Sequence, residues 1–231
     1  MRTYVIGDIH GCNRTFQALL GRLALRPGDT VVLLGDLIDR GPDSKGVVDT
    51  VWRLQDERGV HVICLRGNHE QLLLDALDDP QRLDAWLFNG GRQTLHSFGL
   101  DHPETLPAAY LQFFYKMPHW HEIKGYLCVH GGLDFSAPDP LERTDAMLWI
   151  RRWYDQIDYT WLGERIILHG HTPADMEAIR AQYNKLPAKQ YLNLDNGCVY
   201  ALLEGGRAGL GALLAIRLDD PRELIGVQNV E

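Results

Sequence analysis

Residues 4–11 read Tyr-Val-Ile-Gly-Asp-Ile-His-Gly, an apolar run followed at once by a glycine and two polar side chains. The apolar run is typical of a buried strand, and the glycine lets the backbone turn sharply into a loop. Asp8 and His10 are two positions apart, so their side chains point the same way from an extended segment. The stretch therefore predicts a strand whose carboxyl end carries a carboxylate and an imidazole.

The same arrangement recurs twice in the first third of the chain. The apolar run 31–34 precedes Gly-Asp-Leu-Ile-Asp-Arg-Gly at 35–41, and the run 62–65 precedes Arg-Gly-Asn-His-Glu at 66–70. Apolar residues at helical spacing follow the first two strands, and a further helix is expected from Glu70 to Leu77. Such βα units predict parallel strands, and sites form outside the carboxyl ends of strands in sheets of this kind.

The second half of the chain predicts more strands and a less regular segment. Strands are expected at 126–129 and 166–168, and a second, more antiparallel sheet at 191–195, 199–203 and 210–218. A helix is expected over 144–154, and the polar, Trp-rich segment 78–121 is expected to form short helices and loops over the site. The order predicts an α/β fold, a β-sandwich of mixed sheets flanked by helices, in one domain over 1–231.

The charge, the apolar runs and the cysteine spacing of the chain limit the classes of function that it can have. The chain has 231 residues with a formal net charge of −8, which disfavours a nucleic-acid polymer held by a broad basic surface. The first residues lack the pattern of a signal peptide and there is no apolar run of about 20 residues, so we expect a cytoplasmic protein with no signal peptide and no membrane partner. The four cysteines show no CxxC spacing and are expected to be free thiols.

The polar residues at the strand ends have the chemistry of a dinuclear metal site. Two divalent ions about 3.5–4 Å apart form a clamp for in-line phosphoryl displacement, and they favour oxygen ligands, imidazoles and one bridging carboxylate. With Asp36 as the shared carboxylate, one ion is expected on Asp8 and His10. The second is expected on Asn68, His130 and His171.

The remaining polar residues supply acid catalysis and phosphate binding. His69 is adjacent to a ligand but is not needed as one, and a hydrogen bond to the carboxylate of Asp39 would orient it as the general acid. Arg40 is expected to bind phosphoryl oxygens, and Arg151 is a further candidate. A lone aspartate after glycine is usually a turn or cap residue, but six ligand-type side chains at strand ends make that interpretation poor.

These segments resemble the phosphoprotein phosphatase family of dinuclear metallophosphoesterases, whose motifs are GDxHG, GDxxDRG, GNHE and a later HGG. The resemblance is greatest to short bacterial and phage serine/threonine phosphatases, such as lambda phosphatase, and covers residues 2–199. It implies the same six metal ligands, the Asp39–His69 catalytic pair and a phosphate-binding Arg40. The segment Leu-Trp-Ile-Arg at 148–151 is similar to the one that supplies a second arginine in short members.

The resemblance implies a metal-dependent phosphoester hydrolase, foremost a serine/threonine protein phosphatase in which a metal-bridging hydroxide attacks directly. Manganese is the expected ion, with iron and zinc as alternatives, and the expected partner is a phosphorylated protein or peptide. A dinucleoside polyphosphate hydrolase acting on diadenosine tetraphosphate is the first rival, although Asp39 and Glu70 favour the protein phosphatases. A binding module that holds a phosphorylated partner without turnover is the second rival.

Overall fold

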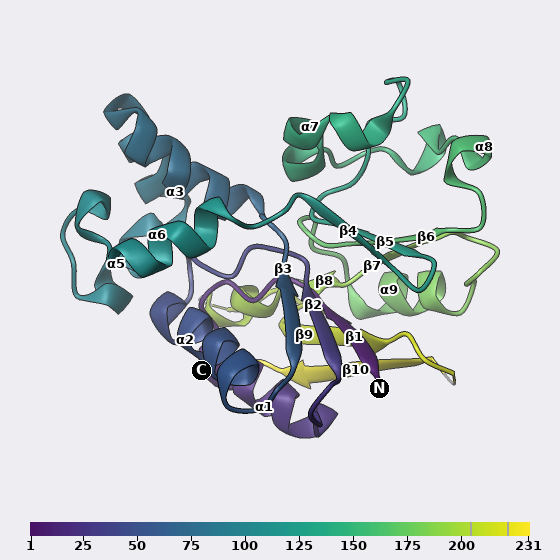
Figure 1. Ribbon diagram of the computed structural model, residues 1–231, viewed down its shortest axis with the longest axis horizontal. Helices are drawn as coiled ribbons and strands as arrows, with labels where there is room; N and C mark the ends of the chain where they lie inside the picture. Colours follow the sequence, from purple (N-terminus) through teal and green to yellow (C-terminus); the bar gives the residue numbers. More distant parts are fainter. Residues whose placement is uncertain (204, 221) are drawn as a thin grey trace.

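The computed structural model describes residues 1–203, 205–220 and 222–231, and it contains two β-sheets flanked by helices (Figure 1). In spatial order, the first sheet holds β10 (Glu223–Gln228), β9 (Ala212–Arg217), β1 (Thr3–Ile6), β2 (Thr30–Leu33) and β3 (His61–Cys64), and β8 (Asp195–Asn196) pairs with β9. The second holds β4 (Trp120–Ile123), β5 (Tyr126–Val129), β6 (Ile166–His169) and β7 (Tyr191–Asn193). Both sheets mix parallel and antiparallel pairs, which confirms the predicted fold class.

Nine α-helices and several shorter turns connect the strands in the described part of the chain. The helices are α1 (Asn13–Leu23), α2 (Ser44–Asp56), α3 (Asn68–Asp78), α4 (Leu83–Trp86), α5 (Arg92–Phe98), α6 (Ala108–Tyr115), α7 (Thr144–Trp149), α8 (Tyr159–Leu162) and α9 (Met176–Tyr183). No helix among the described residues is both long and apolar enough to span a bilayer.

Alternate side chains of β1 show how the layers pack. Tyr4 and Ile6 lie in the core that the first sheet shares with helices, where Phe16 of α1 also packs. Val5 points to the opposite face, into the core between the two sheets that Leu168 of β6 completes. Trp153 lies in a third core on the far side of the second sheet. The order is therefore helices, sheet, sheet, helices.

The carboxyl-terminal part of the chain differs from the prediction. Residues 210–218 were expected in the second sheet, but β9 pairs antiparallel with β1 and so belongs to the first sheet. The predicted strand 199–203 is wrong, because a 3-10 helix, η6 (Cys198–Leu202), takes its place. Gly197 has φ of 64°, in the left-handed region that favours glycine, and this turn ends the extended backbone of β8.

The segment 78–121 contains α4, α5 and α6, and Figure 1 shows α5 and α6 on the same side of the molecule as α3. The segment also contains the first residues of β4, which the sequence did not predict. The predicted helix 144–154 is shorter than expected, because α7 ends at Trp149 and Ile150 has extended backbone.

Candidate metal centre

The predicted metal ligands all lie at the carboxyl ends of strands and all are buried. The two sheets present their strand ends to one place, so β1, β2 and β3 contribute from one side and β5 and β6 from the other. His10 N–H donates to the carbonyl oxygen of Asp36 at 2.8 Å, which ties the loop after β1 to the loop after β2. The structure therefore brings together residues that are up to 163 positions apart, as in the bond from His171 N–H to Asp8 Oδ2 at 3.0 Å.

Asp36 lies at the centre of the cluster. Its Oδ2 is 3.4 Å from His10 Nε2, and its Oδ1 is 3.4 Å from His130 Nε2. Two groups of side chains share Asp36 and have their ligand atoms within 4.8 Å of one another: His10 with His69, and His130 with His171. This shared position is the one that a bridging carboxylate requires.

Backbone carbonyl groups fix the orientation of two of the imidazoles. His10 Nδ1–H donates to the Ile38 carbonyl at 3.0 Å, and His130 Nδ1–H donates to the Leu34 carbonyl at 2.8 Å. A carbonyl oxygen only accepts, so Nδ1 carries a proton in both rings and Nε2 faces Asp36. Metal-binding histidines are usually held in this way, with one ring nitrogen anchored and the other presented to the ion.

Asn68 links the second group. Its Oδ1 lies 3.0 Å from His130 Nε2 and 2.8 Å from His171 Nδ1. An amide oxygen between two imidazoles is a neutral ligand for a divalent cation.

The cluster also carries buried atoms whose bonding capacity is unused. Asp8 Oδ1 and His171 Nε2 have no hydrogen-bond partner among the described residues. Burial raises the pKa of Asp8 well above its usual value, and the charge of the neighbouring carboxylate of Asp195 raises it further. Buried carboxylates are costly unless a cation pairs with them. The carboxylate, amide and imidazole groups of the cluster, together with these two unpartnered atoms, fit a pair of divalent ions.

His69 and Asp39 form a buried pair beside this cluster. His69 Nδ1–H donates to Asp39 Oδ2 at 2.8 Å, and both side chains are inaccessible to solvent. The bond commits one ring nitrogen of His69 and leaves Nε2 outside it. An imidazole oriented by a carboxylate in this way can act as a general acid.

Two residues that hold Asp39 were missed by the sequence analysis. Trp86 Nε1–H donates to Asp39 Oδ2 at 3.0 Å, and Thr94 Oγ1–H donates to Oδ1 at 2.6 Å. Both come from the segment 78–121, which therefore does more than cover the site. They lie 47 and 55 positions from Asp39, and no local pattern in the sequence signals either contact.

Glu70 organises the loop that carries Asp36. Its carboxylate accepts N–H bonds from Asp36 at 3.0 Å, Leu37 at 2.7 Å and Gly67 at 2.8 Å. A Cβ on Gly67 would lie 2.2 Å from Asp36 Oδ1, so only glycine permits this close approach. The motif Asn68-His69-Glu70 pointed to Glu70, but its role became apparent only from these contacts.

Two arginines lie at the rim of the cluster. Arg40 Nη1–H donates to His10 Nε2 at 2.8 Å. Arg151 Nη1–H donates to the carbonyl of His171 at 3.2 Å and to Thr172 Oγ1 at 3.3 Å. Both guanidinium groups are therefore anchored to metal-ligand segments, where they could meet a phosphoryl group.

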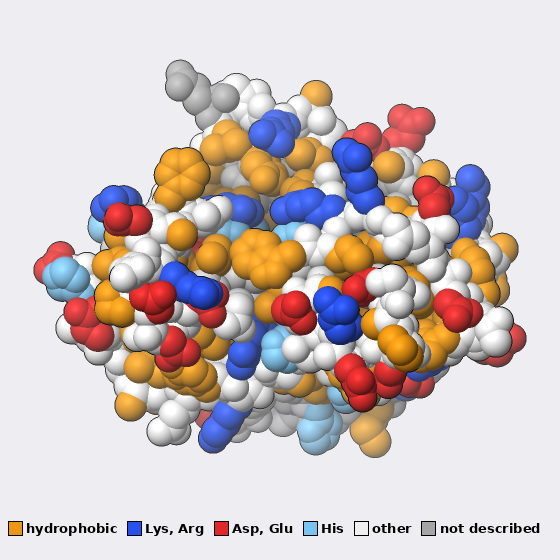
Figure 2. Space-filling model, turned by 90° about the horizontal axis from the view of Figure 1, so that it is seen from above, with side chains coloured by type: hydrophobic (Ala, Val, Ile, Leu, Met, Phe, Trp, Pro, Cys, Tyr) orange, Lys and Arg blue, Asp and Glu red, His pale blue; other side chains and the backbone are white. Residues whose placement is uncertain are grey.

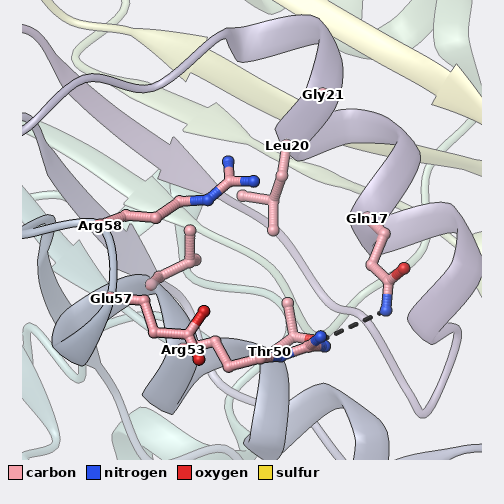
Figure 3. A pocket seen from close by; sticks show the side chains of 8 residues that line it. Gln17, Leu20, Gly21, Thr50, Arg53, Glu57 and Arg58 are labelled. Atoms are coloured by element: carbon pink, nitrogen blue, oxygen red, sulfur yellow. Dashed lines mark hydrogen bonds between the residues drawn. The ribbon is translucent and has the colours of Figure 1, made fainter.

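A separate cavity of about 290 Å³ lies between α1 and α2 (Figure 3). Gln17 Nε2–H donates to Thr50 Oγ1 across it, and Arg53 and Glu57 also line it. None of its lining residues belongs to the strand ends, so it is not part of the metal centre.

The chain is similar in sequence and in fold to known proteins. Residues 1–203 match the family described as Calcineurin-like phosphoesterase. "Bis(5'-nucleosyl)-tetraphosphatase, symmetrical" of Pseudomonas putida (strain GB-1) is 29% identical over 134 residues, which are 58% of this chain and 43% of that protein. "Serine/threonine-protein phosphatase 1" of Salmonella typhimurium (strain LT2) is 43% identical over 89 residues, 38% of each chain.

The chain therefore spans less than half the length of these curated relatives in its matched regions. A solved structure assigned as a candidate diadenosine tetraphosphatase covers 100% of this chain and 94% of its own, with a TM-score of 0.69 and 23% identity, which supports the fold. The family implies a dinuclear divalent metal site, and the family match covers most of the sequence. The chain belongs to the calcineurin-like phosphoesterase family.

Proposed function

We propose that this phosphoesterase is a serine/threonine protein phosphatase. The observation that carries the proposal is the buried Asp39–His69 pair, with its bond of 2.8 Å. Hydrolysis of a phosphoserine or phosphothreonine expels a strongly basic alkoxide, which needs a proton as the bond breaks. A dinucleoside polyphosphate expels a nucleoside phosphate, whose leaving phosphate oxygen is far less basic. A general acid held this firmly therefore favours an alkyl phosphomonoester.

The proposed metal ligands are the six residues named from the sequence. Asp8, His10 and Asp36 would hold one ion, and Asp36, Asn68, His130 and His171 the other, with manganese as the proposed metal. When bound, two such ions supply a nucleophile from water and offset charge on the phosphoryl oxygens.

The protein's own groups position the substrate. Arg40 and Arg151, which approach the cluster from different segments, would bind the phosphoryl oxygens and stabilise the charge that develops on them. Trp86 and Thr94 keep Asp39 in place, and Asp39 keeps the His69 ring oriented so that Nε2–H can donate its proton to the leaving oxygen.

A dinucleoside polyphosphate is the second candidate substrate. It is favoured by the relative from Pseudomonas putida, whose name specifies a symmetrical bis(5'-nucleosyl)-tetraphosphatase. A module that binds a phosphorylated partner without turnover is less well supported, because such a module has no use for a general acid.

The test measures phosphate release from a phosphothreonine peptide and nucleoside diphosphate release from diadenosine tetraphosphate, with the same manganese-loaded protein. We expect the peptide to be preferred in kcat/KM, and His69→Asn to slow the peptide more than an aryl phosphate. A preference for the nucleotide would select the second candidate. Peptide binding without phosphate release would select the binding module.

A further inference from the structure

Exposed apolar side chains gather at a cavity beside the candidate site. The cavity has a volume of about 420 Å³, and its wall includes Arg40, Phe88, Tyr200, Leu202 and Leu203. Phe88 is 91% exposed, Leu202 42% and Leu203 49%. Figure 2 views the molecule from above, and hydrophobic side chains lie next to Lys and Arg side chains on the face that it presents. Single exposed apolar residues are ordinary, but a group around one cavity points to a ligand.

Arg40 links the cavity to the candidate metal centre. The guanidinium of Arg40 bonds to His10, while its backbone N–H donates to the Gly90 carbonyl at 3.2 Å. Gly90 also lines the cavity, and Phe88 is two residues before it. A substrate whose phosphoryl group is bound by Arg40 therefore has its neighbouring atoms at the mouth of this cavity.

The opposite wall is built by η6, the 3-10 helix that replaces the predicted strand. Tyr200 N–H donates to the Gly197 carbonyl at 2.9 Å, which closes the turn and presents Tyr200 and Leu202 to the cavity. The guanidinium of Arg207 lies 4.7 Å from the centroid of the Tyr200 ring. A backbone hydrogen bond and the cation–π contact of Arg207 thus hold this wall.

We propose that this cavity binds an apolar side chain that flanks the phosphorylated residue of a protein substrate, and so sets the sequence preference of the enzyme. The inference rests on the proposed phosphatase function. In a dinucleoside polyphosphate, further phosphates separate the reacting phosphorus from each base. Those phosphates would lie along Leu202 and Leu203, and Arg40 is the only Lys or Arg among the residues that line this cavity. An aliphatic or aromatic side chain matches that wall better.

The test uses two phosphothreonine peptides that differ only in carrying leucine or serine beside the phosphothreonine, with each flanking position examined in turn. For one of these positions we expect kcat/KM to be about 10-fold or more higher for the leucine peptide, the size of discrimination that hydrophobic pockets give. Phe88→Ser and Leu203→Ser should each bring the ratio of the two peptides towards one. The ratio is informative because a general loss of activity would leave it unchanged.

Tyr159→Ser is the matched control, since Tyr159 is 52% exposed on α8 and is not among the residues that line the cavity. It should keep the leucine preference. Hydrolysis of both peptides without a preference, or a preference that survives both cavity variants, would overturn the cavity assignment and leave the proposed function intact. If neither peptide is hydrolysed while diadenosine tetraphosphate is, the proposed function fails, and this inference fails with it.

Discussion

Replacing Thr94 by valine tests whether the segment 78–121 takes part in catalysis. The substitution keeps the shape of a buried side chain and removes one hydroxyl, which donates to Asp39 Oδ1 at 2.6 Å. Asp39 N–H retains Ser44 Oγ as an acceptor at 3.1 Å, and Oδ2 retains both His69 and Trp86. The change therefore removes one bond to the carboxylate and leaves the bond to His69 in place.

The same hydroxyl also accepts from Asp39 N–H at 3.0 Å and lies 2.9 Å from Ser44 Oγ, but the bond to the charged carboxylate is the strongest of these contacts. A hydrogen bond to a charged, buried group is worth about 1.5–3 kcal/mol, and we expect the free energy of unfolding to fall by at least that amount. A general acid contributes about 10²–10⁴-fold in rate. In the variant, His69 keeps its bond to Asp39, although Asp39 is held less firmly. We therefore expect only part of the general acid's rate contribution to be lost, so that kcat for a phosphothreonine peptide falls about 10-fold.

The assay compares two leaving groups. An aryl oxygen leaves without much help from an acid, so turnover of an aryl phosphate should change by less than about twofold. Thr94→Ser keeps the hydroxyl and should restore the peptide rate. Equal slowing of aryl and alkyl phosphates would refute the reasoning, because it would mean that Thr94 supports the metal centre and not the acid.

Three further predictions concern the centre and its surroundings. Asp36→Asn should abolish binding of both metal ions, measured by metal analysis after dialysis, while the far-UV circular dichroism stays native; retention of both ions would contradict the bridging role. Glu70→Gln should lower metal affinity at least tenfold in a chelator competition, because it replaces an acceptor that faces several backbone N–H groups; unchanged affinity would show that those bonds do not position Asp36. Burial alone would raise the pKa of Asp29, but bonds from Arg2 hold it below its usual value, so its stabilisation is present at neutral pH and is lost as the pH falls below about 4. Asp29→Asn should therefore lower the urea midpoint at pH 7 more than at pH 3, and an equal loss at both would contradict this.

The strand ends were predictable because their signal is local. An apolar run, a glycine and a polar residue adjoin in sequence at Asp8, Asp36 and Asn68, and parallel βα units bring such ends to one edge. Each of these residues lies where the pattern placed it, beside the histidines that follow β5 and β6.

The missed features depend on contacts between distant parts of the chain. The pairing of β9 with β1 joins residues more than 200 positions apart, and an apolar strand at 212–217 fits either sheet equally well by pattern alone. Trp86 and Thr94 were missed for the same reason. Both bind the carboxylate of Asp39, which precedes α2 and α3 in the sequence, whereas they follow these helices. The error at 199–203 has another origin, because one left-handed residue, Gly197, redirected an otherwise strand-like run.

Positive φ angles outside glycine are concentrated at the candidate site. Among the described residues other than glycine, seven have positive φ, and five of them are the candidate site residues His10, Asp36, Asp39, Arg40 and His171. Left-handed backbone costs an L-residue about 1–2 kcal/mol and persists only where its surroundings hold it. Here the bonds between the loops after β1 and β2, and the backbone N–H bonds that Glu70 accepts, hold the backbone of His10 and Asp36. Because these bonds come from the backbone and from Glu70, a metal-ligand variant such as Asp36→Asn should lose the ions and keep the fold.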